Sequence, residues 1–282
     1  MTLQRVVNCG RRERQNILLL RSAFAPTVAK ALAGRKASAD PDKSGKGHTM
    51  EIQDKVTIIT GASEGIGMAI AEAMAKDGAK LVLAARSADK LDAAVKDMPH
   101  ALAVPTDMTK PADIKNLFDK TLEKFGRVDI LINNAGQGLY SKFEDVKLEE
   151  YRAIMELNIF AVMEAMQMAI PIMRKQGGGL ILNISSRVSQ NYYPNLSAYA
   201  STKYALNALS LTARTELEPD NIKVAIFMPR MTSTQFGQNS KGQHPDFSAG
   251  VPPRPGMVID TPQQVAAKVA EQIKADTAEE GM

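Results

Sequence analysis

A tyrosine and a lysine four residues apart, Tyr199 and Lys203, are the pair in this sequence best suited to proton transfer. Side chains at this spacing project from one face of a helix. An ammonium group beside a phenol favours the phenolate, so it lowers the tyrosine pKa toward the range of a general acid or base. Such pairs also occur as ordinary surface contacts. The pair therefore needs support from the rest of the chain.

A glycine-rich segment at residues 60–67, with the sequence TGASEGIG, could bind the pyrophosphate of a dinucleotide. It follows a short apolar run and opens a stretch of helical period, where free backbone N–H groups and the helix dipole attract an anion. A tight strand-to-helix turn without a ligand is the alternative. The residues predicted to contact the cofactor here are Gly61, Ser63, Glu64, Gly65, Ile66 and Gly67.

Arg86 lies at the end of the second apolar run, where NAD sites usually carry an acidic residue for the ribose 2′-hydroxyl. A guanidinium group instead matches a 2′-phosphate. This residue therefore favours NADP(H) over NAD(H). The alternative is an ordinary solvated arginine, because Glu64 in the glycine turn supplies no second cation.

These residues need a scaffold that brings strand ends together, and the pattern from residue 55 onward indicates one. Short apolar runs alternate with longer stretches of helical period, which is typical of βαβ units and a parallel sheet buried on both faces. The fold class is predicted to be α/β, a Rossmann-like, doubly wound parallel sheet in a single domain at 51–282. Strands are predicted at 56–60, 80–84, 101–105, 130–133, 180–184 and 223–227, and helices near 66–77, 111–125, 149–175, 198–217 and 262–275.

Charge and composition narrow the function classes. The net charge is +4, but residues 1–50 hold ten Lys and Arg against three Asp and Glu, so the remainder is mildly acidic and nucleic acid is not an expected partner. The single cysteine, Cys9, and three scattered histidines predict no metal site. The apolar run at 17–20 is too short to span a bilayer. The basic leader at 1–50 is expected to be disordered or non-native on a cytoplasmic protein, with organelle targeting as the alternative.

Further residues give Tyr199 and Lys203 the context that they need. An Asn-Asn-Ala-Gly element at 133–136 and a Ser-Ser pair at 185–186 follow predicted strands, and Asn158 lies within a predicted helix. Together with the glycine turn, Asp107 and Pro229, this set extends over about residues 54–275. It resembles the short-chain dehydrogenase/reductase family, in its compact branch of about 250 residues.

The resemblance implies a role for each residue of the set. Tyr199 would exchange a proton with the substrate oxygen, and Lys203 would tune that phenol and hold the nicotinamide ribose. Ser186, chosen over Ser185 from the family spacing, would hydrogen-bond the substrate oxygen. Asn158 would hold a water that links Lys203 to solvent. Further cofactor contacts are implied for Asp107, Met108, Asn134, Ala135, Gly136, Pro229 and Thr232.

Some of these contacts have structural alternatives, and the chain departs from the family pattern in two places. Asn134 could tie strand backbones together, and Asp107 could cap the helix expected from 111. Arg230 follows Pro229 where the family usually has glycine, and the chain ends soon after the last predicted helix, where relatives continue into a final strand. The segment 235–256, rich in Gly and Pro, is predicted to be a substrate-covering loop.

The function implied by the resemblance is an NADPH-preferring reductase or dehydrogenase of a small ketone, aldehyde or 3-oxoacyl thioester. Arg187 and Arg230 suggest an anionic substrate. In relatives the helices that carry Asn158 and Tyr199 often form oligomer contacts, so a homodimer or homotetramer is expected. A sugar-nucleotide epimerase or dehydratase is an alternative, although 204–282 is short for its substrate domain. A non-catalytic NADP-binding sensor is another, although sensors would be expected to lose the tyrosine or the lysine.

Overall fold

The computed structural model describes residues 50–242 and 258–281. The predicted leader at 1–50, apart from Met50, lies outside the described residues. The predicted substrate loop is described only from 235 to 242. Every statement below concerns the described part of the chain.

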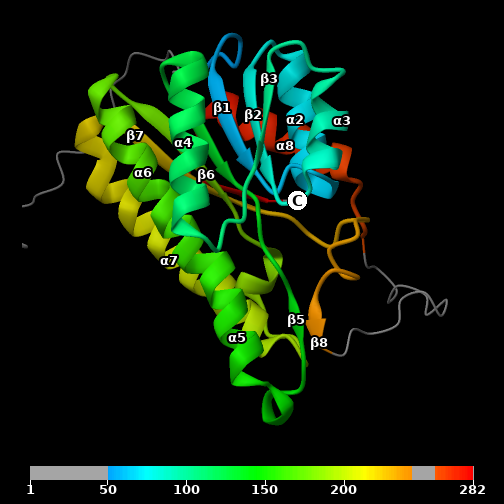
Figure 1. The fold of residues 1–282 in the computed structure, drawn as a ribbon. Coiled ribbons are helices and arrows are strands. Elements are labelled where there is room, and N and C mark those ends of the chain that lie inside the picture. The colour runs from blue at the N-terminus through cyan, green and yellow to red at the C-terminus, as the bar shows by residue number, and fades with distance from the viewer. Residues whose placement is uncertain (1–49, 243–257, 282) are drawn as a thin grey trace, which may run out of the picture. The chain divides into compact units, whose positions relative to one another are not determined.

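A seven-stranded parallel sheet forms the centre of the molecule (Figure 1). Its strand order is β3-β2-β1-β4-β6-β7-β9, which confirms the predicted α/β, doubly wound architecture. The first strands are short runs of β-branched and aliphatic residues that are buried on both faces, as in β1. The strands are β1 Val56–Thr60, β2 Lys80–Ala85, β3 Ala101–Pro105, β4 Ile130–Asn133, β6 Gly179–Ile184, β7 Ile222–Met228 and β9 Glu279–Gly281.

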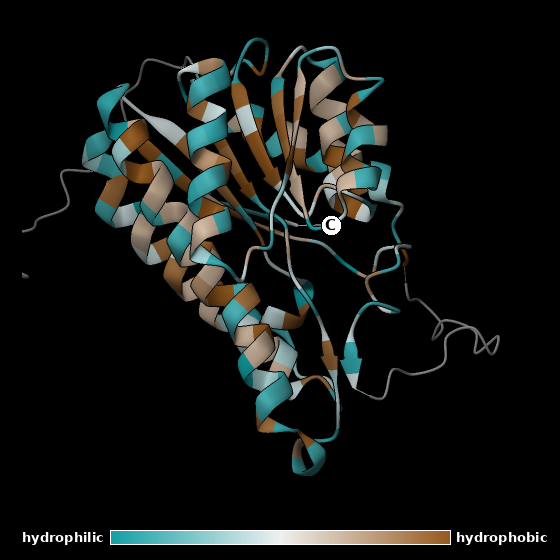
Figure 2. Ribbon diagram, viewed as in Figure 1, coloured by the Kyte–Doolittle hydropathy of each residue, from teal (hydrophilic) through white to brown (hydrophobic). Residues whose placement is uncertain are grey.

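Helices cover both faces of the sheet and enclose two hydrophobic clusters. Figure 2 shows apolar strands between helices whose outward sides are largely hydrophilic. One face carries α2 Gly65–Lys76, α3 Ala88–Val95 and α8 Pro262–Ala275, and the other carries α4 Pro111–Phe125, α6 Ala161–Lys175 and α7 Ser197–Leu217.

The structure departs from the predicted elements in four places. The single helix predicted at 149–175 is divided into α5 Leu148–Met155, a π-helical turn Glu156–Phe160, and α6. Helix α3 was not predicted, because only Leu91 along it is buried. A small parallel pair, β5 Leu139–Tyr140 with β8 Lys241–Gly242, was not predicted; β5 lies beside α5, and β8 falls within the segment 235–256 that was expected to be irregular (Figure 1). A final strand, β9, pairs with β7, so the expected lack of a strand after the last helix was wrong.

By length and composition alone, the helical stretch Leu148–Lys175 is long and apolar enough to cross a membrane. A buried helix of a globular core passes the same test. Its apolar residues Ala165, Ala169 and Met173 are fully buried in the cluster beneath α4 and α6. Packing against the sheet therefore accounts for the composition of this helix.

Candidate active site

The predicted site residues converge on the carboxyl edge of the sheet. Strand β1 pairs with β2 on one side and with β4 on the other. The side of the sheet to which successive strands are added therefore reverses at β1, while all the strands stay parallel. Ligands of open α/β sheets bind outside the carboxyl ends of the strands at such a switch point. The glycine turn follows β1 here, Asn134 to Gly136 follow β4, and Ser185 and Ser186 follow β6.

The glycine turn adopts a backbone that side chains would obstruct. Gly61 and Gly65 have φ angles of 66° and 61°, which L-residues rarely adopt. A Cβ on Gly67 would lie 2.4 Å from the carbonyl oxygen of Gly61. Glu64, the N-cap of α2, makes no side-chain capping hydrogen bond, so the backbone N–H groups of the first turn are available to an anion.

The turn after β4 is tied to the glycine turn by hydrogen bonds. The Asn134 side chain donates to the carbonyl oxygens of Thr60 (3.0 Å) and Gly61 (3.1 Å). The Thr60 hydroxyl accepts from the backbone N–H groups of Asn134 and Ala135. These contacts support the structural alternative for Asn134, because its amide nitrogen is committed to holding the two turns together.

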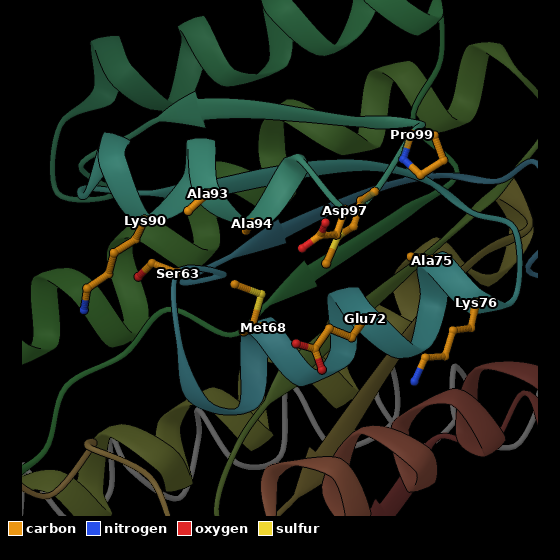
Figure 3. A pocket seen from close by; sticks show the side chains of 11 residues that line it. Ser63, Met68, Glu72, Ala75, Lys76, Lys90, Ala93, Ala94, Asp97 and Pro99 are labelled. Atoms are coloured by element: carbon orange, nitrogen blue, oxygen red, sulfur yellow. The ribbon is translucent and has the colours of Figure 1, made fainter.

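Charged and polar side chains gather beside the glycine turn. Glu64 accepts hydrogen bonds from Lys90 of α3 (2.5 Å) and from the side-chain amide of Asn239 (2.7 Å). A hollow of about 630 Å³ adjoins this place between α2 and α3, with Ser63 and Lys90 at one end (Figure 3). Ser63 is the one predicted cofactor contact that lines this hollow, and none of the predicted catalytic residues lines it. The hollow is therefore separate from the Ser186, Tyr199 and Lys203 cluster described below.

Asp107 and Met108 lie at the carboxyl end of β3. Burial alone would raise the pKa of Asp107, but hydrogen bonds from Thr109 and the positive charges of Lys110 and Arg86 lower it below its usual value. The carboxylate accepts from the backbone and hydroxyl of Thr109 rather than capping α4, so the capping alternative was wrong. The influence of Arg86 on Asp107 places both groups at the same end of the site. Met108 is buried in the core.

Ser186, Tyr199 and Lys203 come together at the carboxyl end of β6. Tyr199 and Lys203 occupy successive turns of α7, and both are more than nine-tenths buried. The Ser186 hydroxyl makes a hydrogen bond with the Tyr199 phenol. The Lys203 ammonium lies 5.9 Å from the centre of the Tyr199 ring and donates to the carbonyl oxygen of Ile184 at 2.9 Å. The structure thus brings these three residues together, and their catalytic role stays a prediction.

The direction of the tyrosine pKa differs from the prediction. Burial raises the pKa of Tyr199 above its ordinary value, the hydrogen bond with Ser186 lowers it in part, and the neighbouring Tyr140 raises it. Burial also lowers the pKa of Lys203 to about 8. Within the protein alone, desolvation therefore outweighs the attraction between phenolate and ammonium. Tyr199 is held as a neutral phenol, the form that donates a proton.

Asn158 lies in the π-helical turn and is almost fully buried. Its oxygen accepts from the backbone N–H of Gln137, and its nitrogen donates to the carbonyl oxygen of Gln137 and to the Thr202 hydroxyl. A Cβ on Gly136 would lie 3.2 Å from the Asn158 oxygen and 3.7 Å from the Lys203 nitrogen. The glycine therefore leaves open the space between these two side chains.

The segment after β7 is anchored by an ion pair. Arg230 makes two hydrogen bonds, of 2.8 and 3.0 Å, with the carboxylate of Asp260, which is almost fully buried. Thr232 forms a β-bridge with Asp260, and its hydroxyl donates to the carbonyl oxygen of Arg230. Pro229 is buried and accepts from the backbone N–H of Arg187. Arg230 is thus committed within the protein, which removes half of the argument for an anionic substrate.

Sequence reasoning missed several residues beside the cluster. Asn207, four residues after Lys203 on α7, hydrogen-bonds both Ser185 and Ser189. The spacing from Tyr199 through Lys203 to Asn207 is a repeat of four, which could have identified it. Phe236 packs against the Tyr199 ring, with 5.7 Å between the centres. Long-range packing of this kind leaves no local signal in the sequence.

Comparison with known proteins agrees with this geometry. The family described as short chain dehydrogenase matches residues 55–244. An uncharacterized oxidoreductase of Methylorubrum extorquens is 37% identical over 217 residues, which is 75% of this chain and 84% of the relative.

Solved structures agree as well. A 3-ketoacyl-(acyl-carrier-protein) reductase from Brucella melitensis, complexed with NADH, has a TM-score of 0.73 and 29% identity, covering 81% of this chain and 96% of its own. An alcohol dehydrogenase from the archaeon Thermococcus sibiricus, complexed with 5-hydroxy-NADP, has a TM-score of 0.69 and 31% identity, covering 82% and 95%. The chain therefore belongs to the short-chain dehydrogenase/reductase family of oxidoreductases.

Proposed function

We propose that this protein is an NADPH-preferring reductase that interconverts a carbonyl group and a secondary alcohol, with Ser186, Tyr199 and Lys203 as its catalytic residues. The observation that carries the proposal is the buried cluster itself. A neutral phenol, hydrogen-bonded to a serine hydroxyl, lies beside a lysine at the carboxyl edge of a dinucleotide-type sheet. Such a group can deliver a proton to a carbonyl oxygen while a hydride is added to the carbon.

The residues present fit a nicotinamide dinucleotide. The uncapped first turn of α2 offers backbone N–H groups to a pyrophosphate, and Gly136 leaves room beside Lys203 for a ribose. Further contacts are proposed for Asp107 and Met108 at the adenine, and for Ala135, Pro229 and Thr232 along the remaining length. When bound, the cofactor supplies or accepts the hydride.

The residues of the cluster divide the proton chemistry among them. The Ser186 hydroxyl holds the substrate oxygen and stabilises the negative charge that develops on it. Tyr199 donates its proton to that oxygen in reduction, or accepts one in oxidation. Lys203, charged at neutral pH because its pKa is about 8, stabilises the phenolate left behind. Asn158 orders the path by which Lys203 exchanges protons with solvent, through its contacts with Gln137 and Thr202.

Preference for NADP(H) rests on Arg86. Its guanidinium lies just after β2, close enough to lower the pKa of Asp107. An arginine thus stands at the strand end where NAD sites usually carry an acidic residue. The solved relatives carry both kinds of cofactor, since one is complexed with NADH and another with 5-hydroxy-NADP. The relatives therefore do not decide between the two cofactors, and the proposed preference for NADP(H) depends on Arg86 of this chain. Lys90 is bound to Glu64, so its charge is partly offset.

The walls around Tyr199 favour a substrate with apolar substituents. Phe236 contacts the phenol ring, and Leu139 and Tyr140 of β5 lie beside α5 and α7. A ketone, an aldehyde or a 3-oxoacyl thioester would place apolar groups there. One solved relative is named a 3-ketoacyl-(acyl-carrier-protein) reductase, which makes the thioester the first substrate to test.

A homodimer or homotetramer in the cytoplasm is proposed as well; the relatives named above are prokaryotic and give no support to organelle targeting.

The activity is tested by following NADPH consumption with the purified chain against ketones, aldehydes and 3-oxoacyl thioesters. Replacement Tyr199→Phe removes the proton donor and keeps the ring, so kcat should fall about a hundredfold or more. Tyr204→Phe, on the exposed side of the same helix, is the matched control and should keep full activity. Undiminished turnover in Tyr199→Phe would refute the assigned chemistry.

Cofactor preference is tested by Arg86→Ala. Loss of a charged contact to the 2′-phosphate should raise the KM for NADPH about tenfold and leave the KM for NADH nearly unchanged. Arg152→Ala, an exposed arginine of α5, is the control for loss of one positive charge. Equal or better use of NADH by the wild-type protein would contradict the argument from Arg86.

A further inference from the structure

Asn207 lies one helical turn beyond Lys203, and its side-chain amide contacts three different segments of the chain. Its oxygen accepts from the Ser185 hydroxyl at 2.5 Å. Its nitrogen donates to the Ser189 hydroxyl at 2.9 Å and contacts the Met228 sulfur at 3.9 Å. Ser185 directly follows β6, Ser189 lies in the short helical turn after it, and Met228 is the last residue of β7. One side chain thus joins the three backbones that surround Ser186.

The orientation of this amide is fixed by its partners. The Ser189 hydroxyl donates its proton to the carbonyl oxygen of Ser186 at 2.6 Å, so it can only accept from Asn207. The nitrogen of Asn207 must therefore face Ser189, and the oxygen must face Ser185. Reversing the amide would place two acceptors, the Asn207 oxygen and the Ser189 hydroxyl, against each other and so break the contact with Ser189. The three hydrogen bonds form a chain from α7 to the backbone of Ser186.

This chain acts on both sides of the reactive hydroxyl. Ser185 immediately precedes Ser186, and Ser189 binds the Ser186 carbonyl oxygen with its hydroxyl and with its backbone N–H. The Ser186 hydroxyl itself accepts from the backbone N–H of Val188 and meets the Tyr199 phenol. Because Tyr199, Lys203 and Asn207 share one helix, the side chain of Asn207 sets the distance between that helix and the serine segment.

We propose that Asn207 is a positioning residue, which holds the Ser186 hydroxyl in register with the Tyr199 phenol through Ser185 and Ser189. This inference rests on the proposed function, because it concerns the alignment of two of its catalytic residues. Catalytic groups lose efficiency when displaced by fractions of an ångström, whereas cofactor binding at the glycine turn lies elsewhere in the site. The role therefore predicts a loss of turnover without a loss of NADPH affinity.

The test is a double-mutant cycle between Asn207→Leu and Ser186→Ala, with kcat, KM and the NADPH dissociation constant measured for each. Asn207→Leu should lower kcat about tenfold with Ser186 present and less than twofold in the Ser186→Ala background. The dissociation constant for NADPH should stay within about twofold of wild type. A similar fall in kcat in both backgrounds, or no fall at all, would overturn the proposal.

Three further variants separate positioning from folding. Asn207→Asp keeps an acceptor for Ser185 but replaces the donor to Ser189, so it should lower kcat in the same manner, as should Ser189→Ala if Asn207→Leu fails to fold. Ser210→Ala removes a buried hydroxyl one turn further along α7, bonded to Asn183 and to the Leu206 carbonyl oxygen. It should lower the melting temperature and leave kcat unchanged.

Failure of the two proposals can be told apart. Full activity of Ser186→Ala and Tyr199→Phe would refute the proposed function. Loss of activity in those variants, together with wild-type kcat in Asn207→Leu, would refute the positioning role alone.

Discussion

Replacing Lys203 with methionine measures what burial of this charge costs the folded state. The lysine is 5% exposed, and burial lowers its pKa from the ordinary 10.5 to about 8. The difference corresponds to about 3 kcal/mol by which the folded state disfavours the charged amine. Methionine has a similar length and no charge, so it removes this term.

The sign of the pH dependence follows from proton binding. Between pH 8 and 10.5 the unfolded chain still binds the proton on Lys203 while the folded protein has released it, so stability rises with pH in this window. Below pH 8 both states are protonated, and the full destabilisation is present. Relative to Lys203→Met, the free energy of unfolding of the wild-type protein should therefore increase by about 1 kcal/mol from pH 7 to pH 9.

Urea unfolding at pH 7 and pH 9, followed by circular dichroism at one protein concentration, gives the required free energies. Lys124→Met removes a positive charge from the exposed surface of α4 and is the matched control. Its difference from wild type should change by no more than about 0.5 kcal/mol. A difference between wild type and Lys203→Met that is flat, or that falls from pH 7 to pH 9, would refute the claim that burial depresses the pKa of this lysine.

Two other substitutions test the scaffold of the site. Gly67→Ala would place a Cβ 2.4 Å from the carbonyl oxygen of Gly61 and 2.5 Å from the Asn134 amide nitrogen, so it should destabilise the fold by about 1–3 kcal/mol and weaken NADPH binding in a fluorescence titration. Wild-type affinity would contradict the close approach of the two turns. Arg230→Met leaves the buried Asp260 carboxylate without its partner and should lower the free energy of unfolding measured with urea. Adding Asp260→Asn should restore part of this loss; a double variant no more stable than the single one would argue against the ion pair.

The sequence was informative where one local pattern determines the structure. Buried apolar runs predicted six strands to within a residue or two at their ends, and the chemistry-bearing side chains follow those strands. The grouping of Ser186 with Tyr199 was implied by the resemblance to the short-chain dehydrogenase/reductase family, and the fold brings these two residues together at the carboxyl end of β6. Helix α3 was not predicted, because a single buried leucine on a polar helix gives little periodic signal.

Contacts between distant segments could not be predicted from one sequence. Arg230 looked like a free cation in the substrate region, but its partner lies 30 residues along the chain. The pKa of Tyr199 was predicted from Lys203 alone, while its burial depends on packing by Phe236 and other parts of the fold. In each case the sequence did not reveal the side chain's burial or its hydrogen-bond partners, because the fold brings these from distant parts of the chain.

The π-helical turn at 156–160 also constrains how this chain can change in evolution. Each residue of an α-helix advances the helix by about 100°, and a π-helical turn adds a residue to that count. Deleting one residue there could restore a continuous α-helix with α5 and α6 close to their present facing, because the wider π-helical turn takes up the extra residue. The change would fall on the turn itself, where Asn158 binds the backbone of Gln137. This stretch should therefore accept changes of residue type on its outer surface far more readily than any change of length.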